Sequence, residues 1–184
     1  KEHALLLDCN TLNYEHIPFE LDDYSLLILN SKKPRSLIKS AYNERKASCD
    51  EALRLLQQHA PIQTLAEARM EHLLLLKDEE LIKRARHVIA EQLRVNLSKK
   101  MLENGDLFTF GKLMNASHAS LKDDFEVSGF ELDTLAETAQ ELPGCLGARM
   151  TGAGFGGCAI AIVKKESIPA FSEKIATSYS KATG

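Results

Sequence analysis

Glycine is concentrated in the stretch GARMTGAGFGGCAIAIV, residues 147–163, which runs directly into an apolar segment. Six of the 10 glycines of the chain lie between Gly144 and Gly157. Glycine permits left-handed backbone conformations and close approach by a second group, so such a turn can present its N–H groups to a phosphate or a sugar. A tight hairpin or a bulge that touches no ligand accounts for the same glycines. Both interpretations stay open on spacing alone.

Two better-known glycine motifs do not fit this stretch. Gly152, Gly154 and Gly157 have the GxGxxG spacing of dinucleotide-binding folds, but that fingerprint requires a helix directly after the glycines. The strand-like run CAIAIV follows here instead. A protein-kinase glycine loop does lie between two strands, but in this chain the lysine follows too closely and no room remains for the catalytic-loop motifs. The stretch therefore predicts a glycine turn between two antiparallel strands.

Titratable side chains also occur at spacings that could support acid–base chemistry. His87 and Glu91 are four residues apart on one face of a predicted helix, with Arg86 beside them. We expect these residues to form a polar network at the surface or between helices rather than a catalytic set. Asp123 and Asp124 are adjacent, so their side chains point apart and cannot form a paired carboxylate site. We expect these two aspartates in a turn.

Hydrophobic periodicity indicates the elements that must position these residues. The runs HALLLDC, YEHIPFEL and YSLLILNS are separated by polar turns, so the first 31 residues are predicted to be sheet. From about Ser36 the period becomes helical and stays so up to Pro61. The order strands, helices, strands, helix favours an α+β domain over a doubly wound α/β one.

Capping patterns divide the helical middle of the chain. Thr64 with Glu67 predicts a capped helix that runs through about residue 76, and Ser128 with Glu131 predicts another that ends at residues 143–144. Between them we expect a longer helix that stops at residues 104–105 and a further helix capped by Asp106. We expect His118 to pack among these helices. A last amphipathic helix is predicted from about residue 168.

Composition restricts the class of protein. With 184 residues, 44% of them hydrophobic, the chain can bury a core and form one globular domain. The net charge of -3 provides no basic surface for nucleic acid, and the longest aliphatic run, Leu73–Leu76, is too short to cross a membrane. The four cysteines contain no CxxC pair, so we expect buried, reduced thiols and no structural metal site. A soluble, cytoplasmic protein is expected.

Four stretches together resemble one family. MTGAGFGGCAIAIV, RSLIKSAYNERKASCDEA, RARHVIAEQLRV and GKLMNASHASLKDDFEVSGFELDTL closely resemble the C-terminal half of galactokinases, which are GHMP sugar and metabolite kinases. The resemblance covers nearly the whole chain. It implies that residues 1–184 form a single C-terminal domain, an antiparallel sheet with a helical layer and a helical insert. Because the chain opens at Lys1 without a methionine, we expect a fragment that lacks the N-terminal, ATP-binding half.

The resemblance implies transfer of the ATP γ-phosphoryl group to the anomeric hydroxyl of α-D-galactose, with Mg²⁺. In that family the sugar-recognition motif, the phosphate loop and the catalytic aspartate belong to the preceding half. We therefore expect no catalytic residue and no metal ligand in this segment, which would be inactive alone. Its expected partners are galactose, ATP and its own N-terminal domain. Two alternatives remain open: a non-catalytic sensor of galactose and ATP, and a kinase for N-acetylgalactosamine.

The resemblance also implies roles for individual residues. Tyr42 matches a tyrosine that contacts galactose. Arg45 lies on the same helical face and is a weaker candidate. Arg35 is a weaker candidate as well. Arg149 is expected to be a salt-bridged sheet residue rather than a phosphate contact. In the glycine turn the substrate-binding candidates are Thr151 and Gly152, and the residues expected to brace the phosphate loop are Ala153, Gly154, Phe155 and Gly156.

Overall fold

The structure is a computed structural model and describes residues 3–33 and 38–184. Five strands are present in this part of the chain: β1 (His3–Leu7), β2 (Tyr14–Pro18), β3 (Tyr24–Asn30), β4 (Cys145–Thr151) and β5 (Cys158–Lys164). The α-helices in it are α1 (Ile38–Leu56), α2 (Glu79–Glu103), α3 (Leu107–Asp123), α4 (Phe130–Glu141) and α5 (Ile168–Thr183). Short 3₁₀ helices lie at Leu65–Glu67, Met70–Leu75 and Lys165–Ser167. The predicted α+β class is confirmed.

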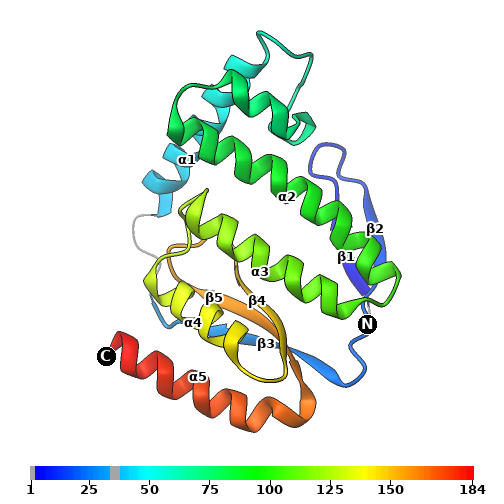
Figure 1. The fold of residues 1–184 in the computed structure, drawn as a ribbon, viewed down its shortest axis with the longest axis vertical. Coiled ribbons are helices and arrows are strands. Elements are labelled where there is room, and N and C mark those ends of the chain that lie inside the picture. Colours follow the sequence, from blue (N-terminus) through cyan, green and yellow to red (C-terminus); the bar gives the residue numbers. More distant parts are fainter. Residues whose placement is uncertain (1–2, 34–37) are drawn as a thin grey trace.

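The strands form two separate antiparallel sheets. The main sheet has the order β3-β5-β4, so the strand that follows the glycine turn lies in its centre. Leu27 of β3 and Ala148 of β4 both pair with Ala161 of β5. The hairpin of β1 and β2 forms the second sheet and lies beside the C-terminal end of α2 (Figure 1). The three strands predicted near the start of the chain are therefore present within residues 3–31, but they are shared between two sheets.

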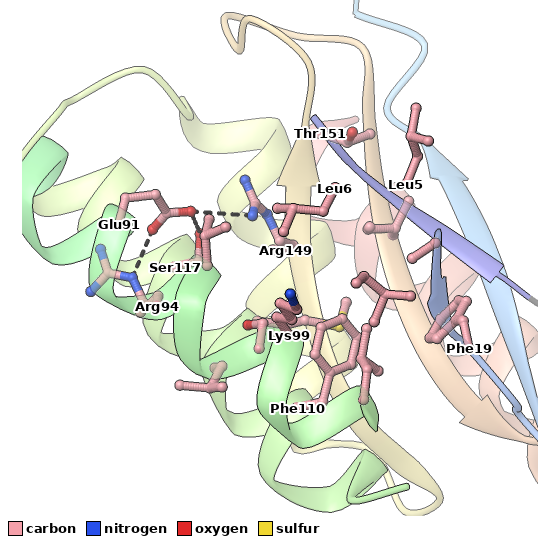
Figure 2. Close-up of a pocket in the computed structure, with 18 of the residues that line it drawn as sticks. Leu5, Leu6, Phe19, Glu91, Arg94, Lys99, Phe110, Ser117, Arg149 and Thr151 are labelled. Carbon is pink, nitrogen blue, oxygen red and sulfur yellow. Dashed lines mark hydrogen bonds and ion pairs between the residues drawn. The ribbon is translucent and has the colours of Figure 1, made fainter. Parts of the chain in front are cut away.

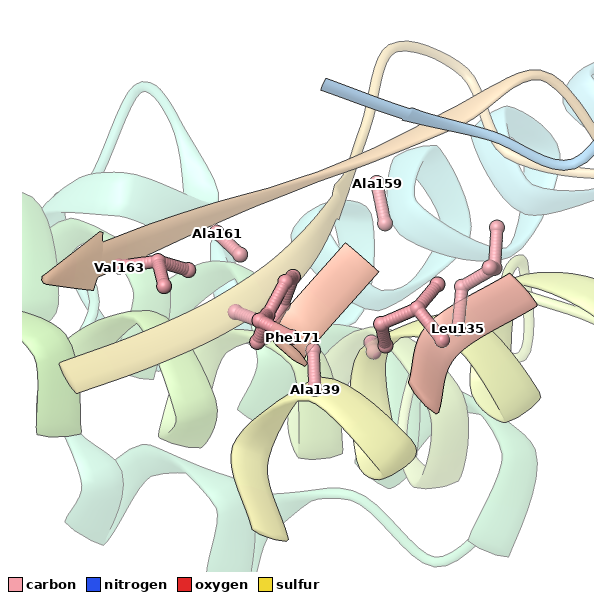
Figure 3. Close-up of a cluster of buried hydrophobic side chains, with 9 residues drawn as sticks. Leu135, Ala139, Ala159, Ala161, Val163 and Phe171 are labelled. Carbon is pink, nitrogen blue, oxygen red and sulfur yellow. The ribbon is translucent and has the colours of Figure 1, made fainter. Parts of the chain in front are cut away.

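Helices α4 and α5 cover one face of the main sheet. Its strands contribute mainly small side chains, and the helices supply Leu135 and Phe171, which are almost completely buried (Figure 3). Alanine at positions 148, 159 and 161 of the sheet leaves room for the Phe171 ring, which carries much of the apolar area of this core. Truncating a buried ring of this kind costs roughly 3–5 kcal/mol of folding free energy.

A second layer, formed by α3, α2 and α1, extends away from the sheet (Figure 1). Helix α3 touches β4 backbone to backbone, because a Cβ atom at Gly111 would lie 2.3 Å from the carbonyl oxygen of Leu146. A Cβ atom at Gly147 would lie 2.1 Å from the carbonyl oxygen of Gly111. Leu56 of α1 and Ile89 of α2 belong to a separate buried cluster between these helices. The glycine pair thus fixes the helical layer to the strand that leads into the turn.

Local capping signals were partly right. Asp106 accepts a hydrogen bond from the backbone N–H of Thr109 at 2.9 Å, as expected of the residue that caps α3. Helix α2 ends at Glu103, as predicted, and is followed by Gly105 at a φ of +70°. The final helix starts at Ile168, as its pattern predicted.

Both predicted capping boxes are wrong. Residues 64–76 form two 3₁₀ helices instead of one α-helix, because the carboxylate of Glu67 accepts from the backbone N–H of Gln63 and the chain becomes extended at Ala68. Helix α4 begins after Gly129, whose φ is +84°, with no side-chain cap. Glu131 instead forms an ion pair with Lys33 at 2.6 Å.

Two further expectations concern thiols and membranes. All four cysteines are free, but Cys9 is exposed and the other three are only half-buried, so the prediction of buried thiols is wrong. Among the described helices, none has the length and apolar character needed to cross a membrane.

Candidate functional site

The glycine stretch forms the turn that joins β4 to β5, as predicted. Gly152, Gly154, Gly156 and Gly157 have φ values of +82°, +83°, +119° and +92°. Such left-handed conformations strain residues that carry a Cβ atom. The conformation of the turn therefore accounts for its glycines, whether or not it also meets a ligand. Gly152 and Ala153 are exposed at its tip, whereas Gly154 and Gly156 are buried.

The turn rests on the loop between α3 and α4, residues 124–128. The N–H of Phe155 donates to the carbonyl oxygen of Val127 at 2.8 Å. A Cβ atom at Gly154 would lie only 2.0 Å from the same oxygen. Phe125 and Phe155 pack against a buried cluster that includes Met150 of β4. Turn and loop are therefore one packed unit.

A hollow of about 300 Å³ separates this unit from α1. We call it the tyrosine pocket, and its lining residues are Tyr42, Arg45, Lys46, Cys49, Leu121, Phe125, Val127, Gly152, Ala153 and Phe155. Five of the predicted site residues meet here, from segments more than a hundred residues apart. Tyr42 is 57% exposed, although its spacing puts it on the same face of α1 as Cys49 and Leu53, which are half-buried. Its hydroxyl and ring are thus accessible at the mouth of the pocket.

Arg45 directs its guanidinium group at the backbone of the 124–128 loop. Its Nε donates to the carbonyl oxygen of Phe125 at 2.7 Å, and its Nη2 donates to that of Glu126 at 3.2 Å. The side chain is only 16% exposed. Arg35, the weaker candidate, lies outside the described residues.

Thr151 lines a different cavity, of about 430 Å³, enclosed by the β1–β2 hairpin, α2, α3 and the sheet (Figure 2). At one end Glu91 accepts from the hydroxyl of Ser117 at 2.5 Å and pairs with Arg149 at 3.3 Å. Burial alone would raise the pKa of Glu91, but the hydrogen bonds from Ser117 and Arg94 and the charge of Arg149 outweigh it, and its pKa is lowered. Arg149 is thus the salt-bridged sheet residue that was predicted.

His87 belongs to a buried polar network and not to an acid–base pair. Its Nδ1 lies 3.0 Å from the hydroxyl of Ser120, which donates to Asp124 at 3.1 Å. Its ring stacks on Phe125, with the ring centres 4.5 Å apart. Burial is the main reason that the pKa of His87 falls to about 4. The imidazole is therefore neutral near pH 7, and the predicted network between helices is confirmed.

The two aspartates at the end of α3 differ from their predicted place. Asp123 is the last residue of the helix and Asp124 is its C-cap, so only Asp124 leaves the helix. Asp124 also pairs with Arg86 at 3.0 Å. His118 is buried among the helices, as expected, and its Nδ1 accepts from the N–H of Met150 at 3.3 Å.

Comparison with known proteins decides the family. Residues 98–181 match the sequence profile described as GHMP kinases C terminal. The galactokinase of Lactococcus lactis subsp. lactis (strain IL1403) is 54% identical over 98% of this chain and 46% of its own length. The galactokinase of Enterococcus faecalis (strain ATCC 700802 / V583) is 52% identical over 100% of this chain and 49% of its own. Residues 98–181 of this chain therefore carry a GHMP kinase C-terminal domain.

Solved GHMP kinases share the fold. The crystal structure of Lactococcus lactis galactokinase complexed with galactose superposes with a TM-score of 0.93 at 53% identity, over 98% of this chain and 47% of that one. L. major mevalonate kinase in complex with R-mevalonate has a TM-score of 0.60 at 20% identity, which shows a common fold alone. The chain spans about half the length of the galactokinases that it matches.

The described part of the chain offers no metal centre. Within residues 3–33 and 38–184, no three His, Cys, Asp or Glu side chains gather in a way that could hold a metal ion. Two carboxylates of the 124–128 loop, which lies beside the tyrosine pocket, are engaged by arginines: Glu126 with Arg84 at 2.7 Å, and Asp124 with Arg86. These groups do not fit a magnesium site.

Sequence reasoning missed two residues that shape the candidate site. Arg84 is 3% exposed and bonds the 124–128 loop, although it lies on the apolar stripe of α2 beside Leu81 and Val88. A charged residue within an apolar stripe was the available signal, because such a group needs a buried partner. Glu126, which adopts a φ of +55°, carried no comparable signal.

Proposed function

We propose that this chain supplies the C-terminal part of a galactokinase, which transfers the γ-phosphoryl group of ATP to the anomeric hydroxyl of α-D-galactose. The observation that carries the proposal is the identity of 54% to a galactokinase across 98% of the chain. The structural likeness to a galactokinase in complex with galactose supports the same substrate. The activity would belong to the full-length protein, and residues 1–184 alone would be inactive.

Tyr42, Thr151 and Gly152 are the proposed sugar contacts. Tyr42 offers a hydroxyl that can donate and accept, together with an apolar ring face against which a sugar can lie. Gly152 lines the same pocket, and Thr151 precedes it at the end of β4. Thr151 lines the larger cavity instead, so it is proposed as a sugar contact only because it adjoins Gly152. Arg45 lines the pocket as well, but its bonds to the backbone of residues 125 and 126 favour a supporting role.

The glycine turn is the proposed brace for the phosphate loop. Exposed Ala153 at its tip leaves the backbone open to a neighbouring segment. Gly154 and Gly156, which are buried, and Phe155, which is half-buried, would act indirectly, by fixing the shape of the turn. Gly156 has little spare room, because a Cβ atom there would lie 2.9 Å from the carbonyl oxygen of Lys33.

ATP and Mg²⁺ would be held mainly by residues outside this chain. Phosphoryl transfer requires a phosphate cradle, a metal ion that neutralises charge on the transferred group, and a residue that orients the attacking hydroxyl. The described residues contain no cluster suited to the metal. What this chain can contribute is orientation: a fixed sugar and a rigid turn lower the entropic part of the barrier.

The partner of this chain would be the N-terminal half of the same protein. Apolar side chains remain exposed on the face of the main sheet that α4 and α5 leave uncovered, and Ile28, 72% exposed, is the most open of those on β3. Related galactokinases are about twice as long, so a further domain is available to cover this face. We place the protein in the cytoplasm, where ATP and phosphorylated sugars are metabolised.

Galactose-dependent ADP release tests the proposal. The full-length protein, with ATP and Mg²⁺, is compared with residues 1–184 alone, and N-acetylgalactosamine, mevalonate and homoserine are offered in turn. Turnover of galactose by the full-length protein alone is expected. Binding of galactose without turnover would overturn the proposal in favour of a sensor. Turnover of N-acetylgalactosamine or another substrate instead of galactose would show that the substrate is wrong.

A further inference from the structure

The 124–128 loop connects two parts of the molecule that have separate cores. On one side lie α1 and α2, whose buried cluster includes Leu56 and Ile89. On the other side lies the main sheet, whose buried cluster includes Ala161 and Phe171. Tyr42 belongs to the first part and the glycine turn to the second, so the width of the tyrosine pocket depends on what joins them.

Arginines attach the loop to the helices. Arg84 of α2 donates from Nη1 to the carbonyl oxygen of Asp124 at 2.7 Å and from Nη2 to the carboxylate of Glu126 at 2.7 Å. Arg45 of α1 donates to the carbonyl oxygens of Phe125 and Glu126. Hydrogen bonds from charged donors are about twice as strong as neutral ones. Together the two helices therefore hold three consecutive residues of the loop, and both of them hold Glu126.

The next residue of the loop holds the glycine turn. The carbonyl oxygen of Val127 accepts from Phe155 at 2.8 Å, and Gly154 packs directly against it. A continuous path thus leads from Tyr42 along one helical turn to Arg45, across the loop backbone to Val127, and on to the turn that lines the opposite wall of the pocket. Every link is a hydrogen bond or a covalent segment of no more than four residues.

Backbone strain marks both sides of this contact. Glu126 and Phe155 have left-handed φ values of +55° and +56°, although neither is glycine. Such conformations are costly and persist only where the surroundings enforce them, most often at functional sites. The carbonyl and the carboxylate of Glu126 are held by Arg45 and Arg84, and the N–H of Phe155 is held by Val127.

We infer that Arg45 is a positioning residue, which sets the distance between Tyr42 and the glycine turn through the 124–128 loop without contacting the sugar itself. The inference rests on the proposed function, because it assigns the galactose affinity of that site to the geometry of this junction. Loss of the Arg45 bonds would let the helix that carries Tyr42 move relative to the turn. The affinity for galactose would fall, whereas the affinity for ATP, which is held elsewhere, would stay the same.

Arg45→Met in the full-length protein removes both hydrogen bonds and keeps an unbranched, mainly aliphatic side chain in place of the arginine stem. The matched control is Arg54→Met on the same helix, since Arg54 forms only an exposed ion pair with Glu51. We expect the KM for galactose to rise about five- to tenfold in Arg45→Met, as for one misplaced hydrogen bond, with the KM for ATP unchanged. Arg45→Lys, which can restore one of the two bonds, should lie between wild type and Arg45→Met.

Amide hydrogen exchange tests the junction independently of activity. The N–H of Phe155 should exchange at least about fivefold faster in Arg45→Met than in wild type or Arg54→Met, because local opening of the loop exposes it. Exchange is measured by mass spectrometry on peptides that span residues 152–157. Unchanged exchange overturns the inference even if the KM for galactose rises, because Arg45 would then act on the sugar directly.

Combination with Tyr42→Phe decides whether Arg45 acts through Tyr42. In the Tyr42→Phe background, Arg45→Met should raise the KM for galactose by less than about twofold, because coupled residues are not additive. If Arg45→Met raises the KM for galactose by the same factor with and without Tyr42→Phe, the inference is overturned. If the wild-type protein does not phosphorylate galactose, the proposed function fails, and the exchange measurement alone decides whether Arg45 holds the turn.

Discussion

Replacement of Gly154 by alanine tests the packing of the glycine turn on the loop that supports it. A Cβ atom at Gly154 would lie 2.0 Å from the carbonyl oxygen and 2.9 Å from the carbonyl carbon of Val127. Ordinary contact begins at 3.4 Å, so turn and loop must separate by more than an ångström. That separation breaks the hydrogen bond from Phe155 to Val127, which is 2.8 Å long.

The chain contains a matched control for the backbone conformation. Gly105, which follows the end of α2, has a φ of +70°, compared with +83° for Gly154, but nothing lies within 4 Å of the place where its Cβ atom would be. Gly105→Ala therefore carries only the left-handed penalty, about 1–2 kcal/mol. Gly154→Ala carries that penalty plus the lost hydrogen bond and the displaced carbonyl group, about 1–2 kcal/mol more.

Urea unfolding of residues 1–184 measures the difference. We expect the free energy of unfolding to fall by roughly 2–4 kcal/mol in Gly154→Ala and by about half as much in Gly105→Ala. In the full-length protein Gly154→Ala should also reduce galactose turnover, whereas Gly105→Ala should retain it. Equal stabilities of the two variants would refute the steric argument, because the contact with Val127 would then relax without cost.

Three further results are expected. Residues 1–184 should fold alone with one cooperative urea transition, because buried clusters occur in both the sheet and the helical layer; absence of slowly exchanging amides in β5 would contradict this. Tyr42→Phe in the full-length protein should raise the KM for galactose about five- to tenfold and leave the KM for ATP unchanged. Tyr14→Phe on the exposed hairpin should change neither KM. If Tyr42→Phe leaves the KM for galactose unchanged, Tyr42 does not belong to the site. Because burial lowers the pKa of His87 from 6.5 to about 4, the unfolded chain takes up a proton below pH 6.5 that the folded chain refuses. The free energy of unfolding should therefore fall between pH 6.5 and 4 by up to about 3 kcal/mol. In urea titrations His87→Gln should make the free energy of unfolding less dependent on pH. The same pH dependence in His87→Gln and wild type would assign the effect to another titratable group.

The fold was predictable where local signals agree with the tertiary structure. The first two apolar runs form the β1–β2 hairpin, and Asp106 caps α3, because neither feature depends on a distant partner. The capping box at Ser128 and Glu131 failed because Glu131 has a better partner in Lys33, which lies 98 residues away in the sequence. A local pattern cannot report a competing partner that only the folded chain brings near.

The site was predictable in its parts but not in its assembly. Resemblance to a family indicated Tyr42 and the glycine turn, and the structure brings both to one pocket. The loop that lies between them was not predicted, because Arg45 bonds backbone carbonyl oxygens, which every residue type presents. Arg84 was the exception, since its charge interrupts an apolar stripe.

The use of backbone acceptors has a consequence for how the pocket is encoded. Because the two arginines bond the carbonyl oxygens of residues 124, 125 and 126, the position of the loop depends on the helices more than on the side chains of the loop. Phe125 is thereby left to pack against His87 and to line the pocket. The geometry around Tyr42 is thus specified by cations on α1 and α2, and one of them, Arg84, does not line the pocket. A substitution at Arg84 should therefore alter substrate affinity while every pocket-lining side chain stays the same.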